Sequence, residues 1–178
     1  MSIERADLVG HSDGATIALL CAAAMPKRVG RVVAIAPHIF AEQVTIQGVR
    51  DFDSRNGGAV WRQNLARRHR DPSAAYDAWR DFWLSENGAE WSVINELSTC
   101  HAPLLLVQGG QDAFGSYAQL DATTRTVAGR SREMRLAGLG HEPHREEADT
   151  VARAVAEFLN ESMSPGEPGD SSGEEKGR

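Results

Sequence analysis

The sequence has no long hydrophobic run. Although 41% of its 178 residues are hydrophobic, no apolar stretch approaches the roughly 18 residues that a membrane helix needs. The first residues also lack the apolar segment and the cleavage site of an export signal. We therefore expect a soluble protein without membrane contacts, and we predict a cytoplasmic location.

Basic residues and cysteines are also scarce. Lys and Arg number 19 against 25 Asp and Glu, which gives a formal net charge of −6. No basic stripe is evident, so binding to nucleic acid is not expected. Cys21 and Cys100 are the only cysteines. They are too few for a disulfide framework, and we expect both to be buried free thiols.

What the chain does contain is an alternation of short apolar runs and helical patterns. Alternation of this kind predicts an α/β fold with a parallel sheet. Strands are predicted at residues 6–9, 31–36, 104–108 and 133–136. Helices are predicted at residues 14–25, 117–127 and 146–159, with a loop at 138–144.

The segment between the second and third strands has a different composition. It holds all four tryptophans, and Tyr76, Trp79 and Trp83 follow helical spacing. The end of the chain is rich in Gly, Pro, Ser and Glu, a composition typical of disorder. We therefore divide the chain into core residues 1–37, a helical insertion at 38–100, core residues 101–161 and a disordered tail at 162–178.

One motif near the start of the chain carries chemistry. The run Gly10-His11-Ser12-Asp13-Gly14 matches the G-x-S-x-G pattern of a nucleophile elbow, and it lies between a predicted strand and a predicted helix, as that pattern requires. Such an elbow is strained and crowded, so we expect both glycines to be needed. For so short a motif, an ordinary strand-to-helix turn is the alternative.

Two further polar residues follow predicted strands. Asp112 comes after the third strand, at the edge where parallel sheets collect catalytic groups, and His141 comes after the fourth. Taken singly, a turn-forming aspartate and a solvated histidine are the alternatives. Together with Ser12 they give the order Ser, Asp, His, which is the order of the triad in α/β-hydrolases.

The sequences ADLVGHSDG, IAP, LLVQGGQD and GHEPH together resemble the α/β-hydrolase-fold family, in particular its capped esterase and carbon–carbon bond hydrolase members. The resemblance covers residues 3–160. It implies that Ser12 is the nucleophile, His141 the general base and then acid, and Asp112 the residue that orients the imidazole. It also implies that the backbone N–H of Asp13 donates to the oxyanion, although an acidic side chain is unusual at that position.

The insertion matches the place of the helical cap that supplies the substrate pocket in this family. The candidates for a pocket that holds a small-molecule substrate are His11, His38, Trp61, Trp79, Phe82 and Trp83. For the aromatic residues the alternative is packing within the cap, and for His11 it is packing within the elbow. His144 has no carboxylate or thiol partners at ligand spacing, so no metal site is expected. The resemblance implies no cofactor.

The chain departs from the family at its start. The family sheet has eight strands and its nucleophile follows the fifth, whereas here the nucleophile is Ser12. We therefore expect an α/β-hydrolase fold that is N-terminally truncated: it lacks its first four strands and the His-Gly loop that gives the second oxyanion donor. Three explanations stay open: a gene start assigned too late or a gene broken by a frameshift, a deliberately cut domain, and a natural short protein that pairs with another chain supplying the missing strands. The first strand becomes a sheet edge, and we expect self-association through it.

Two functions from different classes follow. The first is hydrolysis of a small carboxylic ester or a related activated carbonyl compound through an acyl-enzyme, with activity reduced by the missing oxyanion donor. The second is a non-catalytic hydrolase fragment or interaction module that pairs with another chain. Ser12 in place of a nucleophilic aspartate argues against dehalogenase and epoxide hydrolase chemistry.

Overall fold

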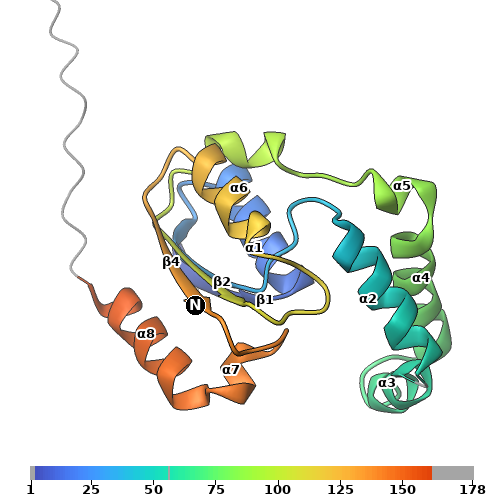
Figure 1. Cartoon of the computed structure of the whole chain (residues 1–178). Helices are drawn as coiled ribbons and strands as arrows, with labels where there is room; N and C mark the ends of the chain where they lie inside the picture. Colours follow the sequence, from blue (N-terminus) through green and yellow to red (C-terminus); the bar gives the residue numbers. More distant parts are fainter. Residues whose placement is uncertain (1–2, 56, 162–178) are drawn as a thin grey trace, which may run out of the picture.

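The computed structural model describes residues 3–55 and 57–161 of the chain. These residues form a four-stranded parallel sheet in the order β1-β2-β3-β4 (Figure 1). The strands are β1 (Ala6–His11), β2 (Val29–Ile35), β3 (Leu104–Gly109) and β4 (Ser131–Leu136). The predicted four-stranded parallel sheet is therefore confirmed. The predicted disordered tail lies outside the described residues.

The two central strands send alternate side chains into two hydrophobic clusters. Val32 and Ala34 of β2 face helices α1 (Asp13–Ala24) and α6 (Ala118–Thr126). Val33 of β2 faces α8 (Ala148–Asn160), and β3 repeats this alternation. Figure 1 shows α1 and α6 on one side of the sheet and α8 on the other. Because both faces are covered, these strands have no position for a solvent-facing polar residue, which explains their continuous apolar runs.

The chain forms further helices between β2 and β3. The first of them lie beside the sheet rather than on either of its faces (Figure 1), whereas the last, a 3₁₀ helix, packs against α1 and α6. Local sequence explains where two of them begin: Glu42 and Thr45 form a capping box, and the Asp71 carboxylate accepts from the backbone N–H of Ala74 at 2.8 Å. The elements of this segment are α2 (Gln43–Ser54), α3 (Gly57–Leu65), α4 (Pro72–Leu84), α5 (Glu86–Ala89) and the 3₁₀ helix η1 (Asn95–Thr99). The domain boundaries proposed from the sequence stay a prediction.

The structure corrects several local predictions. Strand β2 ends at Ile35, because Ala36 has a φ of 49° and left-handed backbone cannot continue a strand. The loop predicted at 138–144 ends early, because Pro143 begins the short helix α7 (Pro143–Glu146). Both cysteines are free, but only Cys100 is buried, whereas Cys21 is half-buried.

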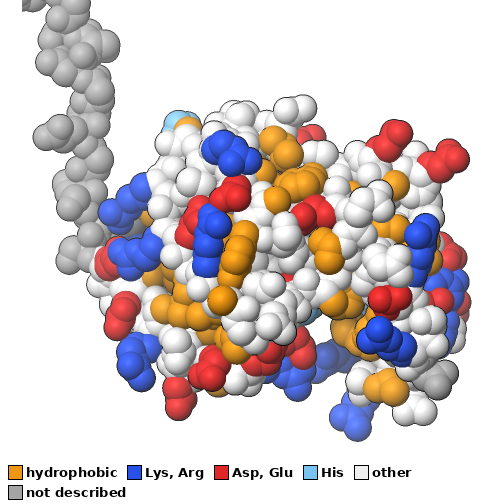
Figure 2. All heavy atoms as spheres, viewed as in Figure 1, with side chains coloured by type: hydrophobic (Ala, Val, Ile, Leu, Met, Phe, Trp, Pro, Cys, Tyr) orange, Lys and Arg blue, Asp and Glu red, His pale blue; other side chains and the backbone are white. Residues whose placement is uncertain are grey.

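Side chains of opposite charge are mixed on the face of the molecule drawn in Figure 2. There they are interspersed around smaller apolar patches. Within residues 3–55 and 57–161, no helix is long and apolar enough to cross a membrane.

Arg31 of β2 connects helix α8 to the sheet through hydrogen bonds. Its side chain is 7% exposed, and its guanidinium donates to the backbone carbonyls of Leu159 and Glu161. One guanidinium nitrogen also lies 3.7 Å from the carboxylate of Asp7 in β1. Carbonyls at the end of a helix have no intrahelical donors. Arg31 therefore supplies two hydrogen-bond donors that the end of α8 lacks.

We expect Arg31→Met to lower the free energy of unfolding by about 2–4 kcal/mol, because two helix-end carbonyls lose their donor and Asp7 loses its ion-pair partner while most of the buried volume is kept. Arg28→Met is the matched control, since the Arg28 guanidinium binds the Ile3 carbonyl at the surface; its effect should stay within about 0.5 kcal/mol. Urea denaturation measures both. Equal losses in the two variants would contradict this account of Arg31.

Strand β1 is an edge of the described sheet, since it pairs with β2 alone. Its Val9 is 55% exposed, and Ile17 on the adjacent α1 is 60% exposed. An open edge flanked by apolar side chains is a template for pairing with another chain. We therefore propose that this chain self-associates through β1.

Sedimentation velocity tests this proposal. The chain should sediment as a dimer or larger species, and Val9→Lys should shift it towards the monomer, because a charge on an edge strand opposes strand pairing. Val60→Lys is the control, because Val60 is equally exposed, at 57%, but lies on α3. A stable monomer before any substitution would disprove self-association.

Candidate active site

Ser12 lies at the sharp turn between β1 and α1. Its φ of 56° is in the left-handed region, a strained conformation for a serine. Gly10 has no room for a side chain, because a Cβ there would lie 2.2 Å from the carbonyl oxygen of Gly14. Gly14 has nothing within 4 Å of its own Cβ position. The prediction that both glycines are needed is therefore wrong for Gly14, because a side chain would collide with the turn only at Gly10.

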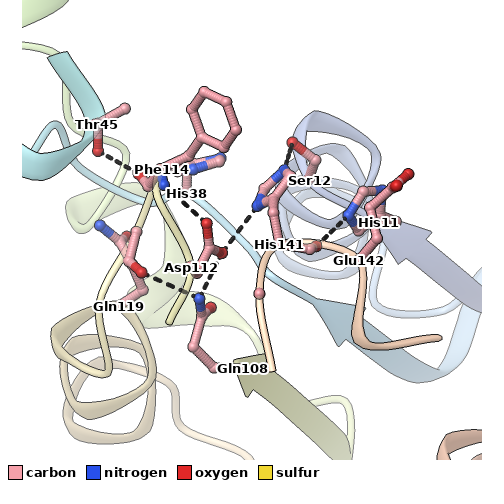
Figure 3. Close-up of polar contacts among 12 residues, drawn as sticks. His11, Ser12, His38, Thr45, Gln108, Asp112, Phe114, Gln119, His141 and Glu142 are labelled. Carbon is pink, nitrogen blue, oxygen red and sulfur yellow. Dashed lines mark hydrogen bonds and ion pairs between the residues drawn. The ribbon is translucent and has the colours of Figure 1, made fainter. Parts of the chain in front are cut away.

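The side chains of Ser12, His141 and Asp112 form one hydrogen-bonded chain (Figure 3). Ser12 Oγ lies 3.0 Å from His141 Nε2, and His141 Nδ1 lies 2.8 Å from Asp112 Oδ2. Although Ser12 is the N-cap of α1, its side chain makes no capping hydrogen bond, so the hydroxyl is available to the imidazole. The three meet because they follow β1, β3 and β4, whose carboxyl ends lie along one edge of the parallel sheet.

Asp112 is buried and accepts from three donors. His141 and the Gln108 amide both donate to Oδ2, the latter at 2.7 Å, and the backbone N–H of Phe114 donates to Oδ1 at 2.8 Å. Burial alone would raise the pKa of Asp112, but the hydrogen bond and charge of His141, together with the other two donors, lower it below its usual value. The carboxylate is thus ionised at neutral pH.

The rings of other histidines lie close to that of His141. The ring of His11 lies 4.8 Å from that of His141 and 4.5 Å from that of His144, and the ring of His38 lies 5.7 Å from that of His141. His11 Nε2 donates to the backbone carbonyl of His141 at 2.8 Å, and His38 Nε2 donates to the carbonyl of Phe114 at 3.2 Å. Burial lowers the pKa of both His11 and His38, so both rings are neutral at pH 7.

A cavity of about 720 Å³ lies over Ser12, between the strand ends and the inserted helices. It brings together these residues predicted from the sequence: His11, Ser12, Asp13, His38, Trp61, Trp79, Trp83 and His141. Asp112 stands behind His141 and is not part of the lining. Sequence reasoning missed several residues that also line the cavity: Thr45, Val49, Phe52, Tyr76 and Phe114. Two of these offered a signal in the sequence: Phe114 follows Asp112 by two residues, and Tyr76 shares the helical spacing of Trp79 and Trp83.

Phe82 is a predicted pocket residue that does not line the cavity. It is 40% exposed and packs edge-on against Trp83, with ring centroids 5.5 Å apart. Trp79 and Trp83 are four residues apart and share one face of α4, whereas Phe82 is rotated by about 100° from Trp83. Helical geometry therefore turns Phe82 away from the site.

Asp13 is the first residue of α1. The N–H groups of a first helical turn have no intrahelical acceptors, and the helix dipole adds partial positive charge there. Its backbone N–H therefore lies where an anion near Ser12 is favoured. No cluster of three or more His, Cys, Asp or Glu side chains in the described part of the chain is arranged to hold a metal ion.

The family is decided by comparison with known sequences. Residues 2–154 match the sequence model of the alpha/beta hydrolase family. This chain belongs to that family. A search of curated proteins gave no match.

Solved structures of similar fold include several hydrolases of this family. A meta-cleavage product hydrolase from Pseudomonas fluorescens IP01 is 20% identical, with a TM-score of 0.65, over 89% of this chain and 65% of that one. The enol-lactonase from Burkholderia xenovorans LB400 is 19% identical, with a TM-score of 0.61, over 89% and 67%. The 2-hydroxy-6-oxo-6-phenylhexa-2,4-dienoate hydrolase from Rhodococcus sp. strain RHA1 is 13% identical, with a TM-score of 0.70, over 89% and 65%.

These identities establish the fold alone. The chain spans about 65% of the length of the first of these hydrolases. Within that span, the described strands, the elbow and the inserted helices make up an α/β-hydrolase fold with four parallel strands.

The neutral histidines of the site, buried His38 and half-buried His11, make stability depend on pH. Because the pKa values of His11 and His38 are lowered in the folded chain, the unfolded chain takes up protons first as the solution is acidified. Their contribution to stability is complete above the unfolded histidine pKa of about 6.5 and is lost as the pH falls below it towards the folded values.

We therefore expect the free energy of unfolding to decrease as the pH falls below about 6.5, the pKa of an unfolded histidine. His38→Gln should make that decrease shallower, because a glutamine amide replaces the donor to Phe114 without titrating. Urea titrations at a series of pH values measure the slope, and the exposed His101→Gln is the matched control. A slope that is the same in His38→Gln as in the unsubstituted chain would contradict the expectation.

Proposed function

We propose that this chain is a serine hydrolase that cleaves a small carboxylic ester, or a related activated carbonyl compound, through an acyl-enzyme. The observation that carries the proposal is the hydrogen-bonded chain from Ser12 Oγ through His141 to Asp112, with separations of 3.0 and 2.8 Å. These distances are within the range in which a base removes a proton from a nucleophile and is itself oriented by a carboxylate.

The proposed reaction begins when Ser12 Oγ attacks the substrate carbonyl carbon and His141 Nε2 takes the hydroxyl proton. The negative charge that develops on the carbonyl oxygen is stabilised by the backbone N–H of Asp13 and the start of α1. His141 then gives its proton to the leaving group, and an acyl-enzyme on Ser12 is left. Water then attacks the acyl carbon as His141 Nε2 takes its proton. The bond between the acyl carbon and Ser12 Oγ breaks, His141 returns the proton to Oγ, and the acid is released.

The lining of the cavity supports an apolar acyl or leaving group. Aromatic side chains from the inserted helices face the catalytic groups across the cavity, among them Phe52, Trp61, Trp79 and Trp83. The similarity to a meta-cleavage product hydrolase, to an enol-lactonase and to a phenylhexadienoate hydrolase supports an activated carbonyl or lactone. In the carbon–carbon case, the leaving group is a stabilised carbanion in place of an alkoxide.

A non-catalytic module that pairs with another chain is the second candidate. The observation that favours it is the open edge of β1, with Val9 exposed. In that case the triad would be kept without turnover, and the edge strand would carry the function.

A fluorophosphonate probe separates the two candidates. For a working nucleophile, we expect one equivalent of label on the folded chain and none on Ser12→Ala, with Ser98→Ala, an exposed serine, as the labelled control. His141→Gln should lower the rate of labelling or of ester turnover by about a thousandfold or more, because the hydroxyl loses its base. Intact-mass spectrometry counts the label. A folded chain that takes up no label would support the second candidate.

A further inference from the structure

Gln108 is a polar residue in the buried strand β3, and the hydrolytic scheme above gives it no task. It is 0% exposed and follows four buried apolar residues. Its Oε1 is buried and has no hydrogen-bond partner among the described residues. An unpaired buried oxygen costs stability, so packing alone does not explain a glutamine here.

The orientation of the amide is fixed by its neighbours. Gln108 Nε2 lies 2.7 Å from Asp112 Oδ2 and 3.2 Å from the carbonyl oxygen of Gly115. An ionised carboxylate and a carbonyl only accept hydrogen bonds, so the NH₂ end of the amide must face them. Asp112 Oδ2 thus accepts from Gln108 on one side and from His141 Nδ1 on the other (Figure 3).

We propose that Gln108 is a positioning residue for the reaction: its amide holds the Asp112 carboxylate in the orientation in which Oδ2 meets His141. The second bond, to Gly115, holds the amide itself in place. Phe114 restrains Oδ1, so the two oxygens of Asp112 are fixed independently and the carboxylate cannot rotate about its bond to Cβ. This inference rests on the proposed function.

The first test removes the donor while keeping the volume. Gln108→Met should lower kcat by about ten- to a hundredfold, the range expected when a hydrogen bond to a charged group is lost. KM should stay unchanged, because Gln108 does not line the cavity. The matched control is Gln119→Met, since Gln119 is also 0% exposed and uses its amide fully, on Ile39, Phe40 and Glu42. That control should lose stability while keeping the pH profile of kcat.

The second test restores a donor that titrates. In Gln108→Glu, two buried carboxyl groups lie side by side and share one proton, which raises the pKa of the introduced group. While protonated, that group still donates to Asp112, so kcat at neutral pH should exceed that of Gln108→Met. As the pH rises, it ionises and repels Asp112. The pH profile should therefore gain an alkaline limb that the unsubstituted chain lacks, an effect that a space-filling role does not produce.

A readout without turnover keeps this inference separate from the proposed function. The proton between His141 Nδ1 and Asp112 is expected to give a low-field ¹H NMR signal. If the chain proves inactive, the proposed function fails, yet a signal shifted or lost in Gln108→Met and kept in Gln119→Met still supports positioning. The inference is overturned if that signal, or kcat together with its pH profile, is the same in Gln108→Met as in the unsubstituted chain.

Discussion

Burial of both faces of the central strands is the constraint on which the rest of this structure depends. Since β2 and β3 place alternate side chains against α1 and α6 on one side and α8 on the other, their middle residues are apolar and buried polar side chains, Arg31 and Gln108, occur only near their ends. Parallel strands end along one edge, so the loops after β1, β3 and β4 converge there. Ser12, Asp112 and His141 meet as a consequence of the sheet.

The same constraint explains what the sequence alone could predict. Continuous apolar runs identified β2 and β3, and polar residues in the loops that follow the strands identified the three members of the hydrogen-bonded chain. Contacts between segments that are far apart in the sequence could not be predicted. Phe52 belongs to α2 and Phe114 to the loop after β3, yet both line one cavity, because packing rather than local pattern brings them together. Gln108 shows the reverse case. A polar residue in an otherwise apolar strand stands out in the sequence, but its hydrogen bond to Asp112 is seen only in the structure.

The inserted helices are tied to the loop that carries the acid. Thr45 at the start of α2 donates to the carbonyl of Phe114 at 2.6 Å, and the Glu42 carboxylate accepts from the backbone N–H and hydroxyl of Ser116. Phe114 in turn donates to Asp112. A displacement of α2 would therefore reach the carboxylate through two hydrogen bonds, so the helices that shape the cavity and the residues proposed for chemistry form one mechanical unit.

The neutral state of His11 and His38 has a consequence for charge within the cavity. Both rings lie within 6 Å of His141, at a distance where a second positive charge would repel an imidazolium strongly. Each ring is instead held uncharged by burial while one nitrogen donates to a carbonyl. His11 and His38 therefore add no positive charge next to the ring that the Asp112 carboxylate orients.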